Sequence, residues 1–73
     1  MPSIIDIQVL EGVFSDGEKA QIIRNVTKAF GDVAGETIMG GTSVRIHEVC
    51  SGSWGYAGNV LTTADALAMR DRG

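Results

Sequence analysis

Pro2 is the first residue of the chain whose chemistry suggests a reaction. If Met1 is removed, Pro2 becomes the chain terminus, and its ring nitrogen is then a free secondary amine that can act as a base. The alternative is structural, because proline is tolerated at the first position of a strand, where no N–H is needed. Pro2 alone does not decide between these two interpretations.

Three further side chains are candidates for the same kind of site. Arg45 and His47 lie two residues apart in a segment that alternates like a strand, so both point to one face. A guanidinium there suits a carboxylate or a developing enolate, and a structural pair with Asp6 or Glu48 is the alternative. Trp54, between glycines, either packs in a core or forms an apolar wall. Taken alone, His47 is more typical of a structural histidine.

Two strands and a helix are expected to position these residues. Alternating β-branched residues predict a strand over 3–10, and the same pattern predicts a second strand over 42–49. Residues 15–30 have the apolar spacing of a helix, with Ser15 and Glu18 as a capping box at its start. Because a helix connects the two strands, they are expected to be parallel neighbours.

The remaining segments are rich in glycine. Gly31 is predicted to be the C-cap of the helix, followed by a loop over 32–41. Dense glycines predict a hairpin at about 52–61. The tail, residues 62–73, has a weak helical pattern that is typical of a short helix or of an arm on a neighbouring chain.

The size of the chain indicates that it needs partners. Residues 1–73 are expected to form a single domain, which is too small to bury much surface without disulfides, a metal or other chains. Cys50 is the only cysteine, which excludes an internal disulfide, and we interpret it as unreactive. With His47 as the only other soft ligand, no metal site is expected. Since 44% of the residues are hydrophobic, we expect an oligomer.

The charge pattern excludes several classes of partner. The net charge is −3, and the six basic residues are scattered, which argues against nucleic acid. No segment reaches the roughly 18 apolar residues of a membrane span, and the N-terminus lacks the pattern of a signal peptide. A lone thiol fits a reducing compartment, so a cytoplasmic protein is expected.

Several segments together resemble the 4-oxalocrotonate tautomerase family. They are the proline after Met1, IIDIQVLEG, SDGEK, TSVRIHEV and SGSWGYAG. The similarity extends over nearly the whole chain up to about Asn59. It implies an α+β fold, in which a β-α-β unit carries a C-terminal β-hairpin. It also implies that two chains pair into a four-stranded sheet with two helices on one face, and that dimers assemble as a homohexamer.

The resemblance also implies a reaction. Members of the family transfer a proton at a carbon next to a carbonyl and need no cofactor, so the expected activity is that of an isomerase, a keto–enol tautomerase. By position, Pro2 is the catalytic base, Arg45 steadies the enolate or carboxylate, and Trp54 stands where the family usually has phenylalanine to exclude water. The expected partners are a small 2-oxo acid or its enol and further copies of the chain.

The chain departs from the family pattern just after its LEG segment. Many members carry an arginine there, which holds a distant carboxylate in a neighbouring subunit, whereas this chain has Val13 and Phe14. We therefore expect a smaller or monocarboxylic 2-oxo acid rather than a 2-oxo dicarboxylate. His47 is a candidate for substrate binding in place of that arginine, because it shares a strand face with Arg45.

Two other functions are compatible with the sequence. Hydratases, dehalogenases and a decarboxylase of the family use protonated proline as an acid, and Glu48 and Glu11 are the candidates here for activating water. Glu48 is expected on the strand face opposite to Arg45, which ranks this alternative second. The chain is also compatible with a non-catalytic subunit of a mixed oligomer, which a retained Met1 would favour.

Overall fold

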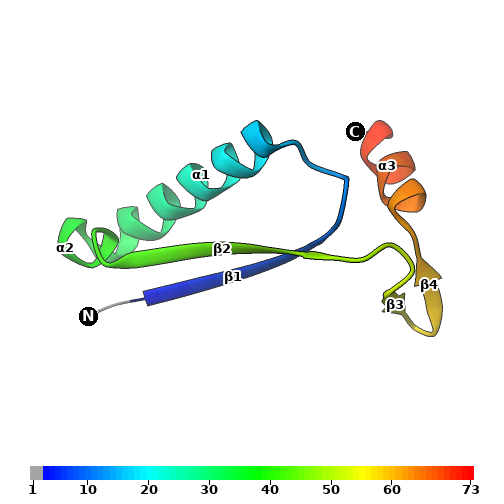
Figure 1. Ribbon diagram of the computed structural model, residues 1–73. Helices are drawn as coiled ribbons and strands as arrows, with labels where there is room; N and C mark the ends of the chain where they lie inside the picture. Colours follow the sequence, from blue (N-terminus) through cyan, green and yellow to red (C-terminus); the bar gives the residue numbers. More distant parts are fainter. Residues whose placement is uncertain (1–2) are drawn as a thin grey trace.

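The computed structural model describes residues 3–73, so Pro2, the candidate base, lies outside the described residues. Figure 1 shows the elements in chain order. They are β1 (Ser3–Leu10), α1 (Asp16–Ala34), α2 (Glu36–Met39), β2 (Thr42–Val49), β3 (Trp54–Tyr56), β4 (Asn59–Leu61) and α3 (Thr63–Asp71). The two long strands have the bounds that their alternating residues predict, and the order is that of a β-α-β unit followed by a hairpin.

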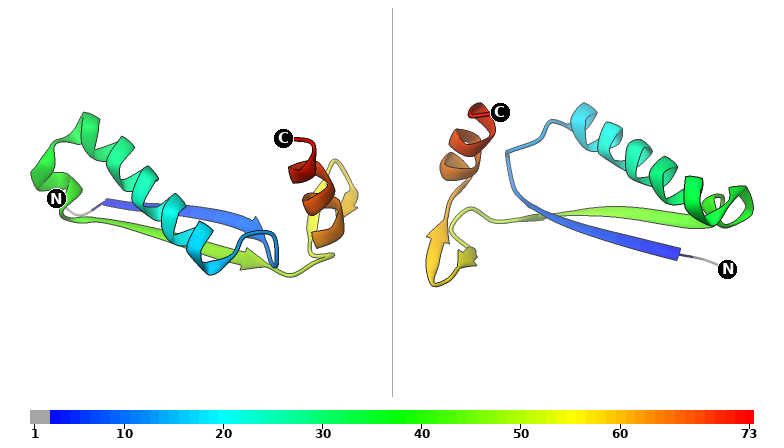
Figure 2. Two further views of the ribbon diagram at one scale, coloured as in Figure 1. Left: turned by 90° about the horizontal axis from the view of Figure 1, so that it is seen from above. Right: turned by 180° about the vertical axis from the view of Figure 1, so that it is seen from behind.

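β1 and β2 are parallel neighbours, as the helical connection between them predicts. Their register runs from Ser3 opposite Thr42 to Leu10 opposite Val49. Helix α1 lies along one face of this pair (Figures 1 and 2). The inward isoleucines and valines of both strands are half-buried under the helix, whereas Asp6 and the other alternate residues are exposed. In the described part of the chain, no helix covers the second face.

Helix α1 begins as predicted but ends later than predicted. Ser15 is its N-cap, and the Ser15 and Glu18 side chains form the reciprocal capping box. The expected C-cap at Gly31 is wrong: the helix continues to Ala34, and Gly35, with a positive φ of 96°, is the C-cap. Gly31 is buried instead. Met39 packs so closely against it that a methyl group placed at Gly31 would lie 2.8 Å from Cβ of Met39. The glycine therefore serves close packing between helices.

The segment expected as a loop over 32–41 is also partly helical. It contains the last turn of α1 and the single turn of α2, which ends at Met39. Thr42 Oγ1 donates a hydrogen bond to the Ile38 carbonyl at 2.8 Å, and this bond ties α2 to the start of β2. The connection from α1 to β2 is therefore a compact corner.

The hairpin is closed by a two-residue turn. β3 and β4 are antiparallel, and Ala57 and Gly58 between them have φ angles of 51° and 82°. Positive φ at both central residues is the geometry that suits the right-handed twist of a hairpin. The following tail is a helix, α3, and the Thr62 and Asp65 side chains form a capping box at its start.

Apolar side chains of this chain remain largely accessible. Among residues 3–73, Leu10 and Val13 are the buried apolar side chains. Ile4 on the helix-free sheet face, Tyr56 and Val60 in the hairpin, and residues of α3 are exposed. No helix in residues 3–73 is long and apolar enough to cross a membrane.

Candidate functional site

Arg45 and His47 project from β2 on the face that no helix covers. Both are exposed, and Asp6 of β1 lies opposite Arg45 in the register. The Nε2 atom of His47 lies 3.4 Å from Oδ1 of Asp6, so this pair bridges the two strands. Within residues 3–73, no ion pair or side-chain hydrogen bond engages the Arg45 guanidinium. Arg45 therefore lacks an ion-pair partner among residues 3–73, whereas a purely structural arginine would have one.

The two glutamates considered as water-activating groups are engaged elsewhere. Glu48 lies on the α1 side of β2, where its Oε1 accepts a hydrogen bond from Lys19 Nζ at 2.8 Å. This bond, and then the Gly12 N–H, lowers the pKa of the Glu48 carboxyl. Glu11 Oε1 accepts from the Ser51 N–H at 3.2 Å. Glu48 is therefore separated from Arg45 by the sheet itself.

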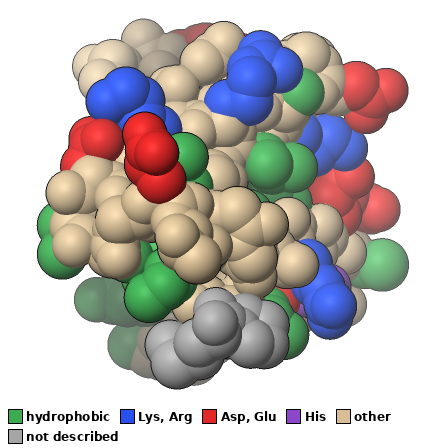
Figure 3. All heavy atoms as spheres, turned by 90° about the vertical axis from the view of Figure 1, so that its left-hand side faces the viewer, with side chains coloured by type: hydrophobic (Ala, Val, Ile, Leu, Met, Phe, Trp, Pro, Cys, Tyr) green, Lys and Arg blue, Asp and Glu red, His purple; other side chains and the backbone are tan. Residues whose placement is uncertain are grey.

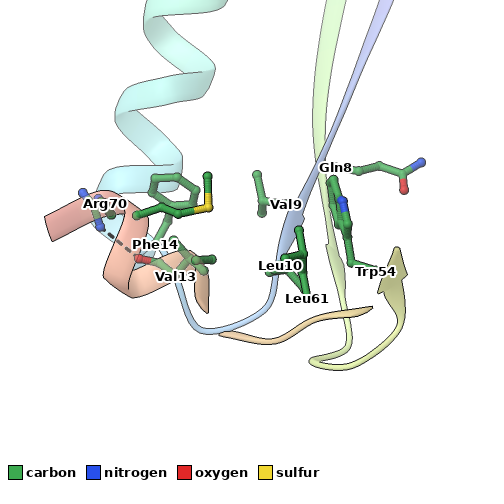
Figure 4. Close-up of a pocket in the computed structure, with 10 residues that line it drawn as sticks. Gln8, Val9, Leu10, Val13, Phe14, Trp54, Leu61 and Arg70 are labelled. Carbon is green, nitrogen blue, oxygen red and sulfur yellow. Dashed lines mark hydrogen bonds between the residues drawn. The ribbon is translucent and has the colours of Figure 1, made fainter. Parts of the chain in front are cut away.

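Trp54 lines a pocket at the far end of the strand pair. The pocket has a volume of about 380 Å³ and lies between the end of β1, the hairpin and α3 (Figure 4). Its lining comprises Gln8, Val9, Leu10, Val13, Phe14, Trp54, Leu61, Ala66, Met69 and Arg70. In Figure 4 the Trp54 indole lies beside Gln8, across the strands from Phe14.

The described part of one chain does not bring the predicted site residues together. Ser3, which follows Pro2 in the sequence, lies opposite Thr42. Arg45 is three residues further along β2, roughly 10 Å away at the usual rise of a strand. Trp54 lines a pocket with Gln8 and Leu10, near the other end of β1. Arg45 and His47 are close neighbours, whereas Trp54 belongs to β3, in the separate two-stranded sheet of the hairpin.

Arg70, a residue of α3, is a charged residue near Trp54's pocket that the sequence pattern does not single out. Its Nη1 donates to the Val13 carbonyl at 2.9 Å, and its guanidinium carbon lies 4.8 Å from the centre of the Phe14 ring. Both guanidinium nitrogens Nη1 and Nη2 also donate to the Glu18 carboxylate. The Arg70 hydrogen bonds, followed by the Ser15 backbone N–H, lower the pKa of Glu18 to about 2. The spacing of Thr62 and Asp65 was the available signal for the helix that places Arg70.

The charges on the surface do not favour a polyanionic partner. Figure 3 shows basic and acidic side chains interspersed on the face that it presents. Among residues 3–73, no group of three His, Cys, Asp or Glu side chains is arranged to hold a metal ion. Among the residues that the structure describes, the feature that remains for the candidate site is the accessible guanidinium of Arg45.

Comparisons with known proteins agree with this fold. The family model described as tautomerase enzyme matches residues 4–64. A chain from a structural study of the 4-oxalocrotonate tautomerase isozymes of Methylibium petroleiphilum is 26% identical, with a TM-score of 0.68. That match covers 89% of this chain and 97% of the other. A comparison with curated proteins gives no significant match. This chain therefore belongs to the 4-oxalocrotonate tautomerase family of tautomerase enzymes.

Proposed function

We propose that this tautomerase-like isomerase transfers a proton between two carbons, or between carbon and oxygen, of a small 2-oxo acid or its enol. In this proposal Pro2 is the general base and Arg45 stabilises the charge that develops on oxygen. The observation that supports it most is the state of Arg45, which is exposed and unpaired with any residue of 3–73. A guanidinium in this state is available to a carboxylate or an enolate.

The proposed chemistry balances without a cofactor. The neutral amine of Pro2 takes a proton from the carbon next to the carbonyl, and the electron pair of that C–H bond moves toward the carbonyl oxygen. The guanidinium of Arg45 stabilises the resulting enolate. The ammonium of Pro2 then returns the proton at another carbon or at oxygen. A base works best when its pKa is near the working pH, and apolar surroundings or a nearby cation lower the pKa of an amine toward that range.

We also propose that the site is completed by assembly of the chain into a homo-oligomer, a hexamer built from dimers. Two observations support this. The candidate residues of one chain are spread along the strands, with Arg45 near the middle and Trp54 near one end. Ile4 is 59% exposed on the helix-free face, which stacking of one dimer on another would cover, whereas edge-to-edge pairing of two chains would complete the four-stranded sheet. Neighbouring copies would then bring Trp54 and Arg45 to one site.

The substrate that we propose is a small monocarboxylic 2-oxo acid. Val13 occupies the position at which the family pattern has an arginine, and Val13 is buried. His47 is the proposed second polar contact, because its ring lies on the same face as Arg45. A distant second carboxylate would lack the arginine that holds it in other members.

Hydration is the second candidate function, and one observation favours it. Asp6 is a carboxylate on the same face as Arg45, and it contacts His47, so it is better placed to activate water than Glu48 or Glu11. The two reactions need opposite protonation states of Pro2. A tautomerase uses the neutral amine and gains activity as the pH rises through the pKa of the base, whereas a hydratase that needs the ammonium loses activity.

The experiment that tests the proposed base is covalent labelling followed by intact-mass measurement. The protein is treated with an acetylenic 2-oxo acid near neutral pH, and the modified peptide is mapped. Cys50 is an exposed thiol, so the Cys50→Ser variant is the working protein, which excludes labelling of sulfur. The control protein has one serine inserted between Met1 and Pro2. The Pro2 nitrogen is then part of an amide bond and is no longer a free amine.

The proposal predicts loss of Met1 and one adduct on Pro2 in the working protein, with none in the control. A retained Met1, or a processed chain without label on Pro2, would contradict it and favour the non-catalytic subunit.

A further inference from the structure

We propose that helix α3 is the wall that limits the size of the substrate's side chain, with Ala66 and Met69 as the specificity-determining residues. The substrate class is then a 2-oxo acid that carries an alkyl or aryl group. This inference rests on the proposed function, in which a neighbouring copy brings Arg45 to the pocket that Trp54 lines. Arg45 then holds the polar end of the substrate, and the pocket receives its apolar end.

The lining of the pocket comes from three parts of the chain. The end of β1 and the loop after it supply one side, and Trp54 and Leu61 of the hairpin supply another. Residues Ala66, Met69 and Arg70 of α3 supply the third. Because α3 closes this side, a change in the size of Ala66 or Met69 changes the space inside the pocket.

Contacts at both ends of α3 hold it in this position. In its first turn, Thr63 Oγ1 donates a hydrogen bond to the Glu11 carbonyl at 2.7 Å. In its last turn, Arg70 Nη1 donates to the Val13 carbonyl at 2.9 Å. The Arg70 guanidinium also pairs with the Glu18 carboxylate. A wall fixed at both ends discriminates by size, because it moves away from a bulky side chain only if these contacts break.

The surface inside the pocket suits an apolar group. Its volume of about 380 Å³ is within the roughly 300–1,000 Å³ that is usual for small-molecule sites. The Phe14 ring lies 4.8 Å from the guanidinium carbon of Arg70, whose charge is already paired with Glu18. An alkyl or aryl group gains free energy on this surface, whereas a second carboxylate would have to leave water for it. The pocket therefore favours 2-oxo acids with an apolar side chain.

The experiment compares two substrates that differ in the size of the side chain. They are the enols of 2-oxo-3-phenylpropanoate and 2-oxo-3-(2-naphthyl)propanoate, whose conversion to the keto form is followed by loss of ultraviolet absorbance. The measured quantity is the selectivity, which is kcat/KM for the naphthyl enol divided by kcat/KM for the phenyl enol. An effect on folding, or on Pro2 and Arg45, is common to both substrates and cancels in this ratio.

Two pairs of variants change the wall in opposite directions. Met69→Ala widens the pocket, and its control is Leu67→Ala, an exposed residue of α3 that is not among the described lining residues. Ala66→Leu narrows the pocket, and its control is Ala68→Leu, which is also exposed and outside the described lining. Each variant and its control have closely matched effects on helix propensity, because leucine and methionine are similar helix formers.

The proposal predicts that Met69→Ala raises the selectivity for the naphthyl enol about tenfold and that Ala66→Leu lowers it about tenfold. One methylene group in an apolar pocket changes kcat/KM by roughly 10- to 200-fold, so changes of this size are expected when the wall contacts the side chain. Leu67→Ala and Ala68→Leu are expected to keep the selectivity of the unmodified protein.

Other results would overturn the inference. Unchanged selectivity in Met69→Ala, with conversion of the phenyl enol retained, would show that α3 does not contact the substrate, and the proposed function would stand. This holds even if Ala66→Leu fails to fold. A change in Leu67→Ala as large as that in Met69→Ala would also overturn it. Failure of the unmodified protein to convert either enol, although Pro2 takes the covalent label, refutes only this substrate class. Failure of both conversion and labelling refutes the proposed function as well.

Discussion

The carboxylate of Glu18 and the guanidinium of Arg70 form a two-point ion pair that joins the first turn of α1 to the last turn of α3. Through this pair the C-terminal helix is held beside the pocket at the end of β1. The Arg70 hydrogen bonds are the largest cause that lowers the pKa of Glu18 from 4.5 to about 2.

The first prediction concerns this ion pair and pH. A carboxyl whose pKa is lower in the folded state stabilises the fold above its unfolded pKa of about 4.5, and this contribution is lost as the pH falls toward 2. Glu18→Gln keeps a side chain suited to the capping box but lacks the charge. Its Tm is expected to be lower than that of the unmodified protein near pH 7, and the two values are expected to converge near pH 2. Circular dichroism melts at fixed protein concentration measure both.

A matched control for this prediction is Glu36→Gln. Glu36 lies in the first turn of α2 and makes no side-chain hydrogen bond within residues 3–73. Its Tm is expected to follow that of the unmodified protein at each pH. A Tm difference for Glu18→Gln that persists unchanged to pH 2 would show that the ion pair does not contribute in this way.

The second prediction concerns the packing of Gly31 against Met39. Replacement by alanine gains helix propensity worth about 1 kcal/mol. The added methyl group would lie 2.8 Å from Cβ of Met39, a stem atom that moves only with its backbone. Overpacking of this kind costs about 1–3 kcal/mol, so it cancels or exceeds the gain. Gly31→Ala is expected to lower the free energy of unfolding by up to about 2 kcal/mol, measured by urea denaturation.

The control for this prediction is Gly17→Ala in the first turn of the same helix. An added methyl group there would meet no atom nearer than Ser15 Oγ at 4.0 Å. Helix propensity then dominates, and the variant is expected to gain roughly 0.5–1 kcal/mol. Similar gains in both variants would mean that α2 does not pack on α1 at Gly31.

The local patterns of the sequence predict most of the elements because those elements depend on local chemistry. Alternation of period two is enough to place the strand Ser3–Leu10 and to put Arg45 and His47 on one face. The Ser15 capping box likewise depends only on neighbours in sequence. Gly31 shows where such reasoning stops. A glycine is required at position 31 because Met39 packs against it, and a C-cap pattern carries no information on that contact.

The candidate site is predictable only in part for a related reason. Arg45 stands out because it is a charged residue inside a strand whose pattern otherwise predicts burial. Arg70 does not stand out, because the weak helical pattern of the tail does not indicate what the helix packs against. Its contacts with Val13 and Glu18 join residues more than 50 positions apart, which only the folded chain brings together.

The third prediction concerns Arg45. Because no residue of 3–73 pairs with its guanidinium, Arg45→Gln is expected to leave the Tm within about 2–4 °C of the original, the range expected of a surface substitution in a domain of this size. If Arg45 stabilises the developing enolate, kcat/KM for a small 2-oxo acid is expected to fall about 100- to 1,000-fold. Loss of the ultraviolet absorbance of the enol measures this rate. Arg24→Gln, on the solvent side of α1, is the control with unchanged activity.

The fourth prediction concerns His47. If its ring contacts the substrate, His47→Ala is expected to raise KM for a monocarboxylic 2-oxo acid about tenfold, which corresponds to one lost hydrogen bond. The kcat is expected to change less, because Pro2 and Arg45 carry out the proton transfer. An unchanged kcat/KM would remove His47 from the site.

The fifth prediction uses the contact of Asp6 with His47 to separate the two candidate reactions. Asp6→Asn keeps an oxygen near His47, whose Nε2 lies 3.4 Å from Oδ1 of Asp6, but removes the carboxylate that could activate water. A tautomerase is expected to retain its rate within about threefold, since the carboxylate takes no part in proton transfer by Pro2. A hydratase is expected to lose about 100-fold or more, because general base catalysis contributes that much. A large loss of hydration together with unchanged enol conversion would show that both reactions occur, with Asp6 needed for only one.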